Sequence, residues 1–265
     1  MSPQLIDLTA LDLGIAGALV ALLAGLSWAG RLGIGRSLLI AGVRTVVQLL
    51  LVGLVLETLF AHATLYWVAL MGAVMLLVAG REVMARQKRR FAGLWGFGLG
   101  TAAMFLSSFS VAVLALAALV QPEPWYQPQY AIPLLGMLLG NTMNGVALSV
   151  DRLTDGAWQQ RELIEGRLAL GEPWTAAIEP VRYDATRSGM IPIINAMAAA
   201  GIVSLPGMMT GQILAGTPPL AAVKYQILIM FLITVGTGFG TLAAVWLAAR
   251  RLFDERERLR LDRLT

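Results

Sequence analysis

The sequence predicts an all-α integral membrane protein that crosses a bilayer about seven times. Of its 265 residues, 57% are hydrophobic and 14% are charged, whereas a soluble domain carries about 25% charged residues. The apolar residues are gathered in stretches that approach or exceed the roughly 20 residues needed to cross the hydrocarbon core. The basic residues lie on alternate loops between these stretches. We therefore expect residues 1–265 to form a single integral membrane domain.

Seven apolar stretches are the candidate spans. In chain order they are Leu8–Gly30, Ser37–Phe60, Thr64–Gly80, Gly96–Val120, Ala131–Val150, Met190–Gly216 and Leu220–Ala249. No basic residue precedes the first stretch, so we interpret it as a transmembrane helix and not as a cleaved signal peptide. The third stretch is short, and the sixth is interrupted by proline and glycine.

The distribution of charge predicts the orientation. The loops after the first, third and fifth stretches and the segment after the seventh hold all but two of the 20 basic residues. An excess of Lys and Arg marks cytoplasmic loops. The other two, Arg44 and Lys224, lie near predicted span ends. We expect the N-terminus outside, the C-terminus in the cytoplasm, and a multi-pass protein of the cell inner or plasma membrane. Because the basic residues are explained in this way, no nucleic-acid partner is expected.

Several classes of chemistry lack their residues in this sequence. The chain has no cysteine and a single histidine, His62, so it offers no thiolate site and no multi-histidine metal site. It also lacks the G-x-x-x-x-G-K-[ST] phosphate loop. No carboxylate lies deep in a predicted span, because Asp12 and Glu57 are near span ends, and this disfavours an ion-driven carrier that works alone. We expect a chain that is not an enzyme and holds no cofactor of its own.

One sizeable polar segment, residues 151–188, is predicted on the cytoplasmic side. Its charged first half can continue the fifth span as a helix until Gly171. After Pro173 an apolar stripe at helical spacing is formed by Trp174, Ala177, Ile178 and Val181. We expect Pro180 to kink the end of this helix. The pattern fits either a helix that lies in the membrane interface or one that docks into a groove of a soluble partner, and the residues alone leave both open.

Polar side chains and helix breakers inside the predicted spans suggest a transport pathway. Buried polar groups in a membrane should face protein or a watery cavity. The sixth stretch should break near Ser204–Gly207, since proline beside glycine makes a continuous helix unfavourable, and broken helices are typical of transport sites. A structural kink is the alternative. The candidate pathway residues are Asn141, Asn144, Asn195, Ser204, Pro206, Met208 and Met209.

Methionines accompany these polar segments. Met137, Met143, Met197, Met208 and Met209 lie in or near them. Thioethers can bind soft metal ions, although adaptable apolar packing is their commoner role. The sequence by itself favours packing.

Several runs give the chain a resemblance to the FetB-type permease family. The most specific is Ser-Leu-Pro-Gly-Met-Met at Ser204–Met209. The full set is Val43–Gln48, Ile132–Asn144, Glu165–Gly171, Gly201–Gly216 and Ala222–Gln226. The resemblance covers nearly the whole chain. It implies the permease subunit of an ABC transporter, linked in this family to iron export and, in plants, to aluminium tolerance.

The resemblance also implies partners and sites. ATP and Mg²⁺ would bind in a separate ATP-binding subunit, which makes the missing phosphate loop expected. Docking would fall at about Gly171–Tyr183, with Glu165, Gly171, Pro173, Trp174 and Ile178 as the coupling residues. A homodimer in membrane lipid, bound to two ATPases, is the implied assembly. The alternatives are a channel or carrier that works without ATP, and a membrane scaffold that transports nothing.

Overall fold

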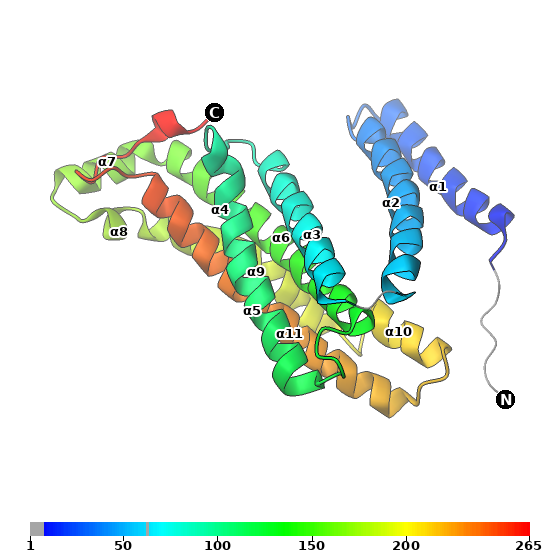
Figure 1. Ribbon diagram of the computed structural model, residues 1–265. Coiled ribbons are helices and arrows are strands. Elements are labelled where there is room, and N and C mark those ends of the chain that lie inside the picture. The colour runs from blue at the N-terminus through cyan, green and yellow to red at the C-terminus, as the bar shows by residue number, and fades with distance from the viewer. Residues whose placement is uncertain (1–7, 62–63) are drawn as a thin grey trace. The chain divides into compact units, whose positions relative to one another are not determined.

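The computed structural model describes residues 8–61 and 64–265, and all of its regular elements are helices (Figure 1). They are α1 (Ala10–Ala29), α2 (Gly35–Ala61), α3 (Leu65–Ala85), α4 (Leu94–Met104), α5 (Ser110–Leu114), α6 (Pro128–Gln159), α7 (Arg161–Ala169), α8 (Trp174–Ala177), α9 (Glu179–Ala199), α10 (Gly207–Leu214) and α11 (Pro219–Arg251). Two π-helical segments, η1 (Phe105–Phe109) and η2 (Ala115–Val120), continue α4 and α5, and a 3₁₀ turn, η3 (Leu261–Arg263), lies near the C-terminus. His62 lies outside the described residues.

The all-α polytopic fold is confirmed, with one correction to the number of spans. Within residues 8–61 and 64–265, six helical stretches are long and apolar enough to cross a membrane. The predicted span Met190–Gly216 is not one helix, because α9 ends at Ala199 and α10 begins at Gly207. Residues 200–206, here called the break, contain Gly201 at φ +81° and end at Pro206. A positive φ ends a helix, and proline cannot continue one from the preceding turn.

The chain forms two compact units. One contains α1 and α2 with Leu214–Thr217, and the other contains Thr64–Ile213 and Pro218–Thr265. In the first unit Gly35 lies so close to α1 that a Cβ atom there would be 2.8 Å from the carbonyl oxygen of Ala24. Most other side chains of α1 and α2 are exposed and apolar, as expected for helices that contact lipid. Whether both units act as one permease domain stays a prediction.

In the second unit α6 lies at the centre and packs against α3, α9 and α11. The helices approach closely because small residues meet at the crossings. A Cβ atom on Gly189 of α9 would lie 2.6 Å from the carbonyl oxygen of Gly145 on α6. The π-helical segment η1 presents Ser108 to α6, where its hydroxyl donates to Thr142 Oγ1 at 3.3 Å. These buried hydroxyls therefore join helices.

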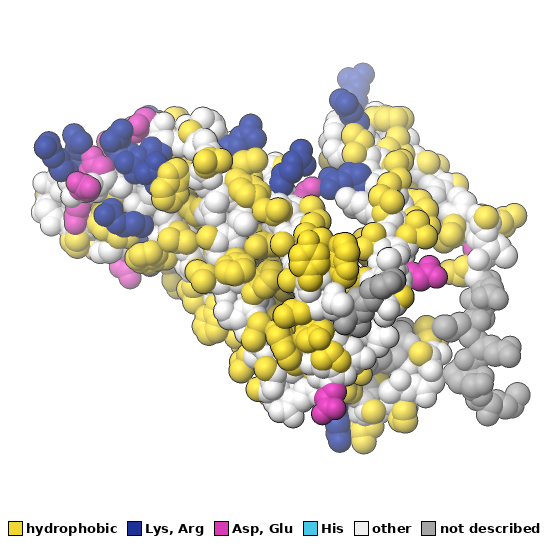
Figure 2. Space-filling view, in the orientation of Figure 1, with side chains coloured by type: hydrophobic (Ala, Val, Ile, Leu, Met, Phe, Trp, Pro, Cys, Tyr) yellow, Lys and Arg dark blue, Asp and Glu magenta, His cyan; other side chains and the backbone are white. Residues whose placement is uncertain are grey.

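Charged side chains concentrate at one end of this second unit, over α7, α8 and the residues after α11 (Figure 2). The rest of its visible surface is mainly apolar. The sequence-based orientation places this charged end in the cytoplasm.

Candidate functional site

The predicted coupling segment forms a tight turn between α7 and α9. Gly171 has φ +90°, a conformation that other residues adopt only with strain. Its N–H donates to the carbonyl of Leu168 at 3.0 Å, and the N–H of Glu172 donates to that of Arg167 at 3.1 Å. These bonds satisfy the last carbonyls of α7 as in other glycine-terminated helices. Gly171 therefore sets the direction in which the chain leaves α7.

The predicted docking helix is much shorter than expected. Its helical part, α8, spans Trp174–Ala177, and Pro180 stands in the first turn of α9 instead of kinking the end of α8. Proline suits a first turn because its missing N–H has no helical partner there. The predicted helix after Pro173, with its stripe from Trp174 to Val181, is thus corrected to one turn of helix followed by the start of α9.

The apolar stripe faces the interior of the chain. Ala177, Ile178 and Val181 are buried, and a Cβ atom on Gly156 of α6 would meet Val181 Cγ1 at 2.8 Å. Ile178 is fully enclosed, so it cannot itself touch a soluble partner in this conformation. The stripe therefore packs the turn against α6.

Trp174 attaches the turn to the segment that follows α11. Its ring centroid lies 5.4 Å from that of Phe253, and the Arg250 guanidinium carbon lies 5.8 Å from the Trp174 ring. The backbone N–H of Trp174 donates to Glu257 Oε2 at 3.0 Å. The carboxylate thus stabilises the first turn of α8. Sequence reasoning missed this contribution, because Glu257 lies 83 residues from Trp174.

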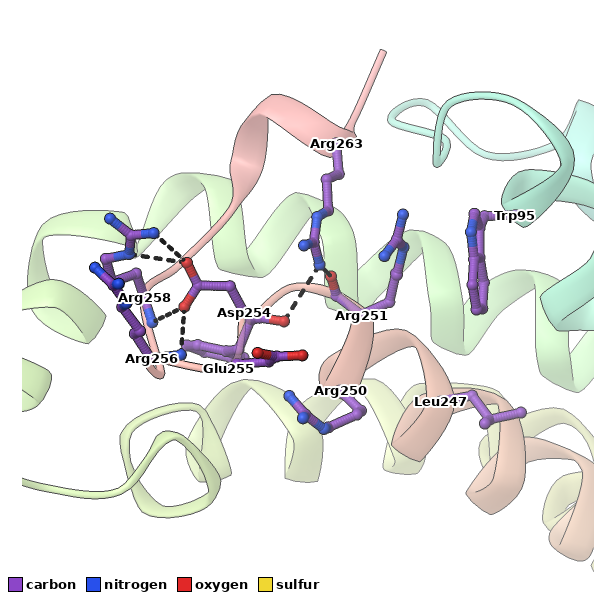
Figure 3. Close-up of a pocket in the computed structure, with 10 residues that line it drawn as sticks. Trp95, Leu247, Arg250, Arg251, Asp254, Glu255, Arg256, Arg258 and Arg263 are labelled. Carbon is purple, nitrogen blue, oxygen red and sulfur yellow. Dashed lines mark hydrogen bonds and ion pairs between the residues drawn. The ribbon is translucent and has the colours of Figure 1, made fainter.

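Residues 252–265, here called the tail, form an ordered loop. Asp254 Oδ1 accepts bonds from the backbone N–H groups of Arg256 and Arg258, and its other oxygen forms an ion pair with the Arg258 guanidinium at 2.7 Å (Figure 3). The backbone bond from Arg258 is the main reason why the pKa of Asp254 falls to about 2. Arg263 donates to the carbonyl of Arg251 at 2.7 Å. The tail therefore keeps its shape through its own charged groups.

The tail also reaches the loop before α4. The backbone groups of Arg90 and Thr265 exchange two hydrogen bonds, at 2.8 and 3.2 Å. The pKa of Arg263 is lowered, first by burial and then by the nearby Arg251 guanidinium. The tail thus connects the α3–α4 loop with the coupling turn.

A groove of about 830 Å³ lies between the turn and the tail. It is lined by Glu165, Leu168, Ala169, Gly171, Glu172 and residues 255–259. Two predicted coupling residues, Glu165 and Gly171, thus line one groove. Pro173 beside it is exposed, and so is Leu170, whose side chain is 86% accessible. The sequence analysis had not selected Leu170.

The predicted pathway asparagines have separate surroundings. The Asn141 amide donates to the carbonyl of Met137 in its own helix at 2.8 Å. Asn144 accepts from Arg86 Nη1 at 2.7 Å, and Asn195 is exposed on α9. Ser204 is exposed within the break. The first two amides therefore already have protein partners.

A cavity of about 510 Å³ lies beside the break and is called the break cavity. Of the pathway candidates, Pro206 and Met209 line it, whereas Met208 packs against the core. Met197 of α9 and Met230 of α11 also line it. Met137 and Met143 pack against the core, as the packing interpretation predicts. Met230 was missed because nothing in the sequence indicates which face of α11 meets the break.

The break cavity contains one polar group that lacks a partner. Gln226 of α11 lines the cavity, and its side chain is only 8% exposed. Its Oε1 atom is buried and accepts no hydrogen bond. Most buried polar atoms in proteins are paired, so this carbonyl oxygen is available to a ligand. Nearby, Thr234 Oγ1 donates to the Met197 sulfur at 2.8 Å.

Comparison with known proteins identifies the family. A family model described as "Uncharacterised protein family (UPF0014)" matches residues 10–253. The chain belongs to the UPF0014 family. A relative in Synechocystis, "UPF0014 membrane protein slr1647", is 40% identical over 98% of this chain and 99% of its own length. No solved structure matches the chain.

Two further relatives carry more specific names. The Escherichia coli "Probable iron export permease protein FetB" is 28% identical over 97% of both chains. The Arabidopsis "Protein ALUMINUM SENSITIVE 3" is 30% identical over 91% of this chain and 86% of its own length. The predicted resemblance to FetB and the plant proteins is thus confirmed. The chain is a multi-pass membrane protein of a permease-like family, and these relatives indicate no catalytic activity.

Proposed function

We propose that the chain is the permease subunit of an ABC transporter that exports a metal cation. A separate ATP-binding subunit would hydrolyse ATP with Mg²⁺, since this chain lacks a phosphate loop. Two copies of the permease would bind two ATPase subunits at the inner membrane. The observation that carries the proposal is the coupling turn, which presents a groove and an exposed leucine at the charged end while its apolar stripe is anchored to α6.

The turn is built to transmit movement. It leads directly into α9, which spans Glu179–Ala199 and ends at the break. At about 1.5 Å per residue, this helix carries a displacement over roughly 30 Å. Closure of the ATPase pair would push on the groove, and α9 would pass that movement to the break cavity. The break cavity would then open alternately to the two sides of the membrane, as in other proteins whose domains close around a ligand.

The proposal that the substrate is a metal cation is supported by other observations. A relative over nearly the full length is named a probable iron export permease. This chain also has a cavity at a helix break, where transporters commonly bind their substrates. Iron is therefore the first cation to test.

The docking surface can be tested with Leu170→Glu. We expect this change to weaken binding of the ATPase at least tenfold, because it places a charge on an apolar contact, and to remove coupled ATP hydrolysis. Leu94→Glu is the matched control, since Leu94 is 87% exposed but belongs to α4 and not to the coupling turn. Co-purification and ATPase activity would be measured in nanodiscs with the host's ATP-binding subunit. Equal behaviour of both variants and the native chain would refute the docking surface.

The same preparation separates the rival functions. Metal flux from liposomes without ATP or partner would identify an independent channel or carrier. A stable complex whose ATP hydrolysis responds to no metal would identify a scaffold. Either result would overturn the proposed function.

A further inference from the structure

The break cavity has an unusual set of ligand atoms for a metal transporter. Among its lining residues there is no charged side chain. The lining side chains that carry donor atoms are those of Met197, Met209, Met230 and Gln226, and the Met197 sulfur also accepts the Thr234 hydroxyl at 2.8 Å. These residues come from α9, α10 and α11, so the cavity brings together segments that the sequence separates.

Gln226 distinguishes this cavity from ordinary methionine packing. Its Oε1 atom is buried without a partner, and an unpaired buried polar group is destabilising. A cation or a donor bound in the cavity would remove that cost. The remaining lining residues are apolar or are glycine and proline, and their side chains supply no such partner.

The donor atoms select the class of cation. Ferric iron and aluminium are hard ions that favour carboxylate and other charged oxygen ligands, and the cavity has none. Thioether sulfur selects soft cations of low charge. The C-terminal end of α9 and the N-terminal end of α10 both border the cavity and carry partial charges of opposite sign, so the donor atoms decide the preference.

We propose that the break cavity binds a soft, low-charge metal cation through the thioethers of Met197, Met209 and Met230 together with Gln226 Oε1. This inference rests on the proposed transport function and narrows its cargo: monovalent copper or silver binds most tightly, ferrous iron more weakly, and ferric iron and aluminium not at all. The cavity is larger than a bare ion requires. Unbranched methionine side chains can turn inward to close around one.

Silver binding to the purified permease, without an ATPase, tests the site directly. Ag(I) is the probe, and the absence of cysteine from the chain removes competing thiolates. We expect the native chain to bind one silver ion. Each of the single variants Met197→Leu, Met209→Leu and Met230→Leu should lower its affinity at least tenfold. Met143→Leu is the matched control, since Met143 packs against the core and does not line the cavity. Gln226→Leu should weaken binding several-fold.

Two further measurements complete the test. X-ray absorption at the silver edge should show sulfur neighbours that disappear in the triple leucine variant. Fe(II) should compete weakly, and Al(III) and Fe(III) should not compete. The proposal is overturned if the triple variant binds silver normally, if Al(III) competes as well as Ag(I), or if an uncharged amphipathic dye occupies the cavity and no metal does. Because no ATPase is present, failure here leaves the docking test unaffected.

Discussion

Replacement of Gly171 by alanine should loosen the coupling turn while leaving the helix bundle intact. Gly171 has φ +90°, and a Cβ atom there would meet nothing within 4 Å. The cost is therefore conformational and not steric. A left-handed backbone costs a non-glycine residue about 1–2 kcal/mol. The turn is stabilised by only a few local hydrogen bonds. The cost should therefore increase the fraction of molecules in which these bonds are broken by 5- to 30-fold.

Amide hydrogen exchange in detergent or nanodiscs measures this opening. The N–H groups of Leu170, Gly171 and Glu172 bond to carbonyls of α7, so they report on the turn. In Gly171→Ala their exchange should accelerate by about the same 5- to 30-fold, while the amides of α6 stay unchanged.

Gly166→Ala is a control that should change the amide exchange rate in the opposite direction. It lies inside α7, and a Cβ atom there would also meet nothing within 4 Å. Alanine in a helix interior is about 1 kcal/mol more favourable than glycine. Gly166→Ala should therefore slow exchange in α7. Slower or unchanged exchange in Gly171→Ala would refute the reasoning, and so would acceleration in both variants.

Two further predictions concern packing and charge. Gly189→Ala should lower the unfolding temperature, because its Cβ atom would approach the carbonyl oxygen of Gly145 to 2.6 Å, and overpacking costs about 1–3 kcal/mol; Gly140→Ala, with open space around it, should not. The Asp254 pKa of about 2 lies below the ordinary 3.8, so the ionised form stabilises the tail above about pH 4, and this contribution is lost as the pH falls from about 4 to 2. Tail amides should lose protection in that range, and Asp254→Asn should reduce the pH dependence to the part that comes from Asp262, whose pKa is lowered by its hydrogen bonds from Arg260. A tail equally ordered at pH 5 and pH 2 would contradict the second prediction.

The sequence allowed the membrane fold to be predicted because span length and composition are local properties. Pro206 and Gly207 indicated the break for the same reason, since the backbone preferences of proline and glycine depend on the residue itself. The contacts of Ile178 could not be predicted in that way. A stripe at helical spacing is the same whether it faces a partner or the chain's own core, and only the position of α6 decides between them. Glu257 and Met230 were missed because their partners are remote in the chain.

The crossing at Gly189 connects the two proposed sites mechanically. Gly189 lies near the middle of α9, about ten residues from the coupling turn and ten from the break, or roughly 15 Å in each direction. It has no side chain, and a Cβ atom there would lie 2.6 Å from the carbonyl oxygen of Gly145 and 2.9 Å from Ser149 Cβ, both on α6. The two helices therefore approach closely at this point, and we expect it to act as a pivot. A push on the turn would tilt α9 about the crossing and shift the break end, with Met197, in the opposite direction. An added methyl group at Gly189 should consequently alter coupling between ATP hydrolysis and metal binding as well as stability, whereas one at Gly140 should alter neither.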